Sequence, residues 1–354
     1  MLQNNSFMTE YNLKNTDLLE GYKLEGYEIL TLHEDGFTKL VLYRHIENGG
    51  YRALRFLNRY IDLNKAEDAE IYKKFQEDCE ILLRIGTGRH PNIARISHPQ
   101  LHNNKAFTDI EYIDGRDLLS YIEDNKSFLP IDEVTNLARN IASALAYCHK
   151  GAGVIHNDLH SRNVMRRKSD GAYILLDFML AFQNGKVVRS SKHEHGDRQY
   201  WAPERWKPDS NGNLPIPTFR SEVYSFGILI YEALTGNVPF PMSDSPLEQQ
   251  LIELKKAHEA SPPPDMFGKR KEAYEKAHPG TTYIKDYPEW LENVIIKCLE
   301  KKPESRFADA KELVLEIERI SEGSELKHLV LKLIDEVKYL RKEIEKLQGK
   351  QMTA

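Results

Sequence analysis

The sequence V-I-H-N-D-L-H-S-R-N-V-M, at residues 154–165, places an aspartate in a polar loop directly after a short apolar run. Asp158 stands five positions ahead of Asn163. Phosphoryl transfer uses such a pair, because the carboxylate accepts a hydroxyl proton and the amide holds a metal ion. The same twelve residues also fit a polar turn that follows a buried strand. The rest of the chain therefore has to distinguish these two interpretations.

Later acidic motifs favour the catalytic interpretation. Asp177 follows the apolar run I-L-L, nineteen residues after Asp158, and would supply a second carboxylate for a phosphate-bound magnesium ion. Further along, W-A-P-E ends at Glu204 and K-P-E-S-R ends at Arg306. A glutamate and an arginine in these motifs predict a buried bidentate ion pair that ties two parts of the chain together.

The surrounding sequence changes from strand-like to helix-like. Short runs typical of strands come first, with a helical pattern among them: strands at 27–32, 39–45, 49–57, 93–98 and 106–113, and a helix at 66–85. After residue 115 the pattern is mostly helical, with one small strand pair: helices at 117–124, 131–150, 221–236, 291–300 and 308–320, and the pair at 154–156 and 173–178. This order predicts an α+β fold with a β-rich lobe followed by an α-rich lobe.

Composition excludes several classes of protein. The net charge of −5 and the interspersed charges argue against a nucleic-acid or anionic-membrane surface. Cys79, Cys148 and Cys298 are far apart, so neither a disulfide framework nor a metal cluster is expected. No apolar run approaches the roughly 20 residues of a membrane span, and the N-terminus lacks a signal-peptide pattern. We therefore expect a cytoplasmic protein by default.

The two ends of the chain differ from its centre. Residues 1–26 form a polar N-terminal extension, to which we assign no function. Residues 324–348 carry apolar side chains at alternating spacings of four and three, which predicts a coiled-coil helix: Leu326, Val330, Leu333, Val337, Leu340, Ile344 and Leu347. A parallel homodimer through this segment is one expectation, with Glu336 and Arg341 paired between chains. A helix docked on the chain's own body is the alternative.

From about residue 27 to 320 the chain resembles the protein kinase superfamily. The motifs H-x-D-L-x-x-x-N, D-F-x, A-P-E, S-x-V-Y-S-F-G and P-E-x-R occur in the family's order. The resemblance implies a bilobal fold with an N-lobe at 27–110, a hinge at 111–116 and a C-lobe at 117–320. It also implies ATP and magnesium as cofactors, with Asp158 orienting the substrate hydroxyl and Asn163 and Asp177 holding the metal.

The same resemblance implies a nucleotide site. It places the backbone of Glu111 and Ile113 against adenine, Ile110 at the gatekeeper position and Asp117 near the ribose. Hydrophobic residues would enclose the base from both sides: Leu40, Ala53 and Met165. His160 occupies a position where serine/threonine kinases carry a lysine that touches the transferred phosphate.

Departures from the family pattern concentrate in the nucleotide-binding half. The glycine-rich loop keeps only Gly36, because its three glycine positions hold His33, Asp35 and Thr38. Side chains there hinder the backbone from closing over phosphates. The phosphate lysine is replaced by Arg55. Its helix partner is Asp78, or Glu77 in another register, and an Arg55–Asp78 pair is expected to span the gap of the usual lysine and glutamate.

The motifs of the other lobe also differ in two places. D-F-G becomes D-F-M, which removes a flexible residue after Phe178. Asn157 replaces the arginine that reads an activation-loop phosphate, so control by such a phosphate is not expected.

We therefore expect an ATP-dependent protein kinase of weak activity. Its acceptor would be a protein hydroxyl, serine or threonine ahead of tyrosine, and the sequence identifies no particular protein substrate. A pseudokinase or scaffold is the first alternative, motivated by the lost glycines and lysine. A small-molecule phosphotransferase is a lesser one, because H-x-D-L-H-x-x-N also occurs in such enzymes, although A-P-E argues against it.

Overall fold

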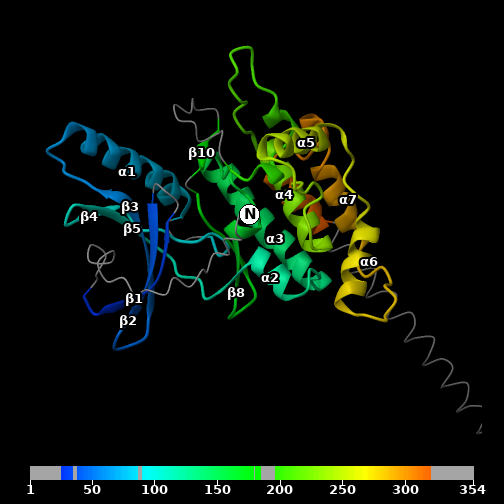
Figure 1. The fold of residues 1–354 in the computed structure, drawn as a ribbon, viewed down its shortest axis with the longest axis horizontal. Helices are drawn as coiled ribbons and strands as arrows, with labels where there is room; N and C mark the ends of the chain where they lie inside the picture. The colour runs from blue at the N-terminus through cyan, green and yellow to red at the C-terminus, as the bar shows by residue number, and fades with distance from the viewer. Residues whose placement is uncertain (1–24, 35–37, 87–89, 179, 185–195, 320–354) are drawn as a thin grey trace, which may run out of the picture.

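The computed structural model describes residues 25–34, 38–86, 90–178, 180–184 and 196–319. A sheet-rich N-terminal part lies beside a larger helical part (Figure 1). The expected α+β architecture is thereby confirmed. The predicted coiled coil at 324–348 and nearly all of the N-terminal extension lie outside the described residues.

The N-terminal part is built on an antiparallel sheet with the strand order β1-β2-β3-β5-β4. Its strands are β1 (Tyr27–Glu34), β2 (Thr38–His45), β3 (Tyr51–Tyr60), β4 (Gln100–His102) and β5 (Lys105–Ile110). Residues 35–37, which include the remaining glycine of the expected glycine-rich loop, lie outside the described residues.

Helix α1 (Ala66–Gly86) packs on this sheet through its apolar face (Figure 1). Phe75 and Cys79 of the helix form one buried cluster with Ile61 and Ala106. Because these side chains are apolar, their burial fixes the helix against the sheet.

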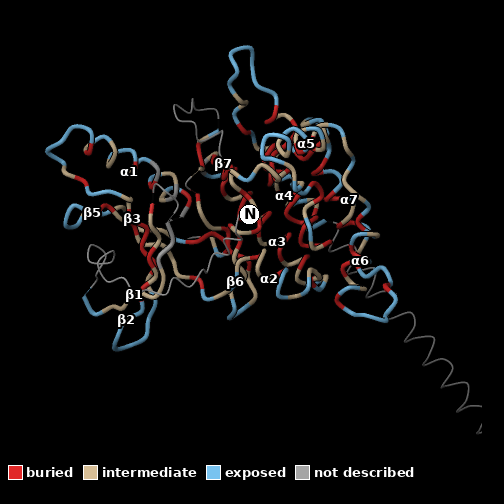
Figure 2. The backbone as a smooth tube through the Cα atoms, in the orientation of Figure 1, coloured by how far each residue is buried: buried red, intermediate tan, exposed pale blue. Residues whose placement is uncertain are grey.

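The helical part surrounds one buried helix, α4 (Phe219–Thr235). Every residue at 221–235 except Ser225 is buried, as the tube in Figure 2 shows. Thr218 and Ser221 form a capping box at its start, and Gly236 ends it at φ +82°. A Cβ at Gly236 would lie 2.2 Å from the carbonyl oxygen of Ser127, so only glycine fits there.

The other helices pack around α4 and expose one face to solvent. They are α2 (Leu118–Asp124), α3 (Ile131–Tyr147), α5 (Leu247–Ala260), α6 (Met266–Ala277), α7 (Glu289–Cys298) and a helix at 310–319. Helix α3 stops earlier than the expected residue 150, because a π-helical turn at Cys148–Ala152 follows it. No described helix has both the length and the apolar character needed to cross a bilayer.

Two small sheets lie apart from the five-stranded sheet and correct the expected strand pairing. The three-stranded sheet has the order β6 (Gly115–Asp117), β8 (Val164–Arg167) and β9 (Tyr173–Leu175). The predicted pair of 154–156 with 173–178 was wrong, because β7 (Val154–Ile155) pairs with β10 (Phe182–Gln183) instead. Strand β6 also places the last two residues of the expected hinge in the helical lobe.

The strand expected at 93–98 was wrong as well. This segment makes only isolated bridges, from Ile93 to Leu175 and from Ile96 to Ile110. Its backbone donors are divided between the lobes: Ala94 N–H bonds the carbonyl of Leu175 at 3.0 Å. Because residues 93–98 divide their backbone hydrogen bonds between two sheets, they form a continuous strand ladder with neither. Strand β4 forms the edge of the five-stranded sheet instead.

The predicted ion pair between Glu204 and Arg306 is confirmed. Both guanidinium nitrogens lie 2.8 Å from the two carboxylate oxygens, and the side chain of Arg306 is fully buried. The remaining guanidinium N–H groups bond the carbonyl oxygens of Glu300, Arg220 and Lys301. This pair holds the 3₁₀ turn at Pro203–Trp206 against the segment just after the turn at Pro303–Ser305.

Candidate functional site

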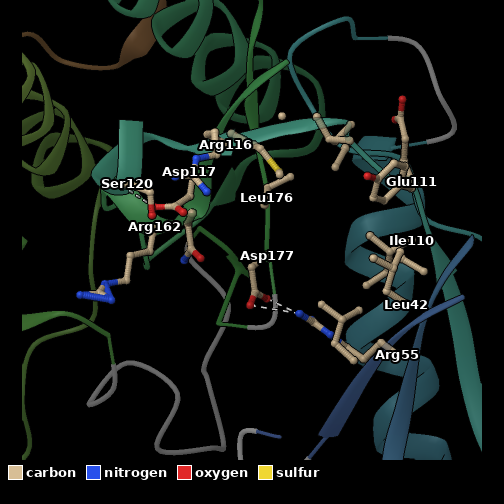
Figure 3. Close-up of a pocket in the computed structure, with 18 of the residues that line it drawn as sticks. Leu42, Arg55, Ile110, Glu111, Arg116, Asp117, Ser120, Arg162, Leu176 and Asp177 are labelled. Atoms are coloured by element: carbon tan, nitrogen blue, oxygen red, sulfur yellow. Dashed lines mark hydrogen bonds and ion pairs between the residues drawn. The ribbon is translucent and has the colours of Figure 1, made fainter. Parts of the chain in front are cut away.

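A cavity of about 370 Å³ lies between the sheet and the helical part (Figure 3). One wall of the cavity comes from strands β1, β2, β3 and β5 of the sheet. The opposite wall comes from β6, α2, β8 and the loop after β9. All the residues that the resemblance assigned to nucleotide line it: Leu40, Ala53, Arg55, Ile110, Glu111, Ile113, Asp117, Met165 and Asp177. Asn163 lines it too.

Several apolar lining residues were not predicted. Leu42 and Leu176 contribute to the walls, as do Ala94 and Ile96. Leu42 was available from the sequence, since it lies two residues after Leu40 on the same face of a strand. Ile96 was not, because its place depends on the bridge between the lobes.

The hinge presents unpaired backbone groups to the cavity. The N–H of Glu111 bonds the carbonyl of Arg95 at 2.8 Å, and the two side chains form an ion pair. Within the described residues, neither the carbonyl of Glu111 nor the N–H of Ile113 has a hydrogen-bond partner. Ile113 is only 4% exposed. Buried backbone groups are rarely left unpaired, so a planar ligand with its own donor and acceptor, such as adenine, fits this edge.

Asp117 already has a structural role at the cavity wall. Its Oδ1 accepts the N–H of Ser120 at 2.9 Å and caps α2. The second carboxylate oxygen keeps capacity for a ligand hydroxyl. Contact with a ribose stays a prediction.

Arg55 and Asp177 face each other across the cavity (Figure 3). Their ion pair is bidentate, with Nη1 3.0 Å from Oδ1 and Nη2 3.1 Å from Oδ2. Asp177 has a left-handed backbone, with φ +54°, which turns its carboxylate toward the sheet. The expected partner of Arg55 was Asp78, whose side chain lies outside what the structure describes, so that pairing stays a prediction.

Donors converge on the carboxylate of Asp158. The side-chain amide of Asn163 donates to the Asp158 carbonyl at 2.9 Å and to Oδ2 at 3.1 Å. The N–H of Asp197 donates to Oδ1 at 3.2 Å, and Nε2 of His160 lies 3.6 Å from Oδ2. This backbone role of Asp197 was not predicted from the sequence.

Electrostatics favour the ionised form of Asp158. Burial opposes ionisation, but His160 and His156 together hold the pKa of this carboxyl below its ordinary value. Burial likewise lowers the pKa of His160, but the carboxylates of Asp158, Asp197 and Asp177 together raise it above its ordinary value. The other imidazole nitrogen, Nδ1, accepts the N–H of Arg162 and so orients the ring.

A buried glutamate anchors the backbone of the loop that carries Asp158. Oε1 of Glu222 accepts the N–H of His156 at 2.7 Å and that of Asn157 at 3.0 Å. Oε2 faces Nε2 of His149 at 2.7 Å, and Nδ1 of His149 accepts the N–H of Ala310. Burial opposes the charge on Glu222, but His149 and these donors hold its pKa below the ordinary value. Glu222 was missed in the sequence, where an acid inside an apolar helix was the available signal.

Two unusual backbone positions shape the loop around Asp158. Asn157 has φ +69°, a region that asparagine tolerates better than most residues, and its amide bonds the carbonyl of Leu180 at 3.2 Å. Gly196 has φ +103°, and a Cβ there would lie 3.1 Å from both the Asn157 carbonyl and Oδ1 of Asp158. Neither residue was predicted to contribute to the site.

The chemistry of Asn163 and Asp177 fits a magnesium ion. The Asn163 nitrogen is committed to Asp158, which leaves the amide oxygen as a ligand. Among the described residues no cluster of three His, Cys, Asp or Glu side chains could hold a metal by itself. Magnesium is commonly bound by one or two protein groups together with substrate phosphates, so this sparse set matches a metal that arrives with nucleotide.

Comparison with protein-family models matches residues 36–316 to the protein kinase domain. A probable serine/threonine-protein kinase of Clostridium acetobutylicum is 28% identical over 277 residues, covering 76% of this chain and 37% of that protein. The serine/threonine-protein kinase PkaA of Streptomyces coelicolor is 30% identical over 261 residues, covering 73% and 41%. PknB of Mycobacterium leprae is 25% identical over 264 residues, covering 73% and 37%. The chain thus spans less than half the length of each relative.

Proposed function

The chain belongs to the protein kinase family, and we propose that it transfers the γ-phosphoryl group of ATP to a hydroxyl group of a protein. Serine or threonine is the proposed acceptor, in keeping with the names of the relatives. The observation that carries the proposal is the environment of Asp158, a half-buried carboxylate that three neighbouring donors orient beside the cavity.

Each group has a role in this reaction. Asp158, kept ionised by its low pKa, accepts the hydroxyl proton as the acceptor oxygen attacks. Asn163 and Asp177 would hold magnesium, which when bound neutralises charge on the phosphates. His160, next to Asp158, donates a hydrogen bond or positive charge toward the transferred phosphoryl group.

The hinge and the apolar walls position the nucleotide in this proposal. Adenine would pair with the carbonyl of Glu111 and the N–H of Ile113, between Ala53 and Met165. Positioning and electrostatics provide most of the rate enhancement in phosphoryl transfer. The departures in the loop at 33–38 therefore weaken nucleotide closure without removing the reacting groups.

Transfer of labelled phosphate from ATP tests the proposal. The intact protein should label itself or a general protein substrate on serine or threonine, as mapped by mass spectrometry. Asp158→Asn should lower the rate by about 10²- to 10⁴-fold, the usual contribution of a general base. The exposed Asp132→Asn serves as the matched control and should keep the full rate.

The alternatives give different results in the same experiment. A scaffold would bind nucleotide, seen as a rise in thermal stability, yet label nothing. Equal labelling by the wild type and Asp158→Asn would contradict the role of Asp158. Labelling confined to tyrosine would overturn the proposed acceptor while leaving the kinase activity in place.

A further inference from the structure

We propose that the ion pair between Arg55 and Asp177 is a latch that lets the cavity accept a nucleoside triphosphate without a divalent cation. The proposal rests on the proposed function, because it concerns the same nucleotide site. It assigns to Arg55 a role that a lysine in this place could not perform equally well.

The latch joins the two lobes across the cavity. Arg55 extends from β3 of the sheet, and Asp177 follows β9 of the helical part (Figure 3). Both carboxylate oxygens are engaged, at 3.0 and 3.1 Å. The side chains are 10% and 27% exposed, so water screens the pair only in part.

Neutralisation of Asp177 matters because a triphosphate carries several negative charges. An unpaired carboxylate on the cavity wall repels a nucleotide that arrives without its metal. A guanidinium held on both oxygens removes most of that repulsion before the nucleotide enters. Metal-free nucleotide therefore loses less affinity in this cavity than in one with a bare aspartate.

Arginine ion pairs recur at two other acids of the cavity. Arg95 bonds both carboxylate oxygens of Glu111, and Arg116 bonds one oxygen of Asp124 through two nitrogens. Arginine is the only basic residue among the described lining residues. Three of the cavity's carboxylates, those of Glu111, Asp124 and Asp177, are thus paired with arginine.

An arginine suits the latch better than a lysine. The planar fork of a guanidinium matches the two oxygens of a carboxylate, whereas an ammonium is a strongly hydrated point charge. A metal bound to Asp177 would place a second positive charge beside the guanidinium and oppose the pair. A magnesium ion can therefore bind Asp177 only by weakening the ion pair with Arg55. The two effects offset each other, so magnesium changes the affinity for ATP only slightly.

Calorimetric titration of the full chain with ATP, in excess magnesium chloride and in EDTA, tests this inference. The wild type should differ by less than about threefold in affinity between the two conditions. Arg55→Lys should lose about tenfold in EDTA, as expected for a weakened charged pair, and less in magnesium. Asp177→Asn should keep its affinity in EDTA and gain nothing from magnesium.

A matched control lies on the same strand. Arg52 forms a forked ion pair with Asp109 and does not line the cavity. Arg52→Lys should bind ATP as the wild type does in both conditions. Thermal unfolding without nucleotide should verify that all four proteins are folded.

The outcomes separate the latch from the proposed function. Wild-type binding that requires magnesium, with affinity in EDTA lower by more than about thirtyfold, overturns the latch and leaves the kinase proposal intact. Equal losses for Arg55→Lys in both conditions also overturn it. Absence of binding in either condition overturns the proposed function, and the latch with it.

Discussion

The helical side and the sheet side of the cavity hold their charged groups in different ways. On the helical side, the loop that carries Asp158 is fixed through its backbone by Glu222, which is buried in α4. On the sheet side, Arg55 meets its described partner, Asp177, across the cavity. The loop of Asp158 is therefore positioned by the core of its own lobe. The side chain of Arg55 is positioned by an ion pair that a ligand can replace.

Both sides depart from the family pattern, the helical side at Asn157 and after Phe178, but the positions that would handle phosphate depart on the sheet side. The glycine, lysine and glutamate positions that differ in this chain lie on the sheet side, at Thr38, Arg55 and Asp78. A side chain that pairs across a ligand site can be replaced together with its partner. A buried carboxylate such as that of Glu222 cannot be removed in this way, because each of its hydrogen-bond donors would be left unpaired.

The largest effect is expected from Glu222→Ala, which breaks the anchor of the helical side. It leaves the N–H groups of His156 and Asn157 and the ring of His149 without their acceptor. Loss of one partner of a buried charged network typically costs about 3–5 kcal/mol of unfolding free energy. Urea denaturation measures this loss.

The exposed Glu248 on α5 provides the control for that experiment. Glu248→Ala should change the unfolding free energy by no more than about 0.5 kcal/mol. A similar small loss for Glu222→Ala would contradict the anchoring role and remove the contrast between the two sides.

A second change separates geometry from stability on the helical side. Gly196→Ala places a Cβ 3.1 Å from Oδ1 of Asp158, and it should lower kcat by about 10²-fold, as small misplacements of reacting groups do. Gly212 also has a positive φ but has no atom within 4 Å of its ideal Cβ. Gly212→Ala should carry a similar backbone strain of about 1–3 kcal/mol and leave kcat unchanged. Equal kcat values for the two variants would contradict a steric role of Gly196.

The smallest effect is expected from pH, because the helical side buries a histidine in its neutral form. His258 is fully buried, its Nδ1 lies 2.9 Å from the hydroxyl oxygen of Tyr224, and burial with the nearby charge of Lys301 lowers its pKa to about 3. Because the folded state holds this ring neutral, stability is lost as pH falls below about 6.5, at about 1.4 kcal/mol per unit. Between about pH 7 and about pH 5 the loss is about 2 kcal/mol.

His258→Gln cannot take up this proton and should lose about 2 kcal/mol less than the wild type over the same interval in urea denaturation. Glu232, whose pKa burial raises to about 7, changes stability in the opposite direction. It is present in both proteins, so the difference between them isolates His258. Parallel pH dependences would show that His258 does not titrate on unfolding.

The sequence was sufficient for the fold class and for most of the candidate site. Residues such as Asp158 and Asn163 share one short loop, so their spacing alone brings them together. The predicted lining residues of the cavity came from the resemblance to the kinase family. Strand pairing at β7, β8 and β9 was predicted less well, because short apolar runs do not specify their partners.

What the sequence determined by itself is therefore the identity and order of the reacting groups. Tertiary structure decided their partners: Arg55 meets Asp177 from 122 residues away, and Asn157 meets Glu222 from 65 residues away. It also decided the charge states, because the pKa of Asp158 depends on burial and on the distance to His160. Distances between remote residues arise only when the chain packs, and local patterns carry no record of them.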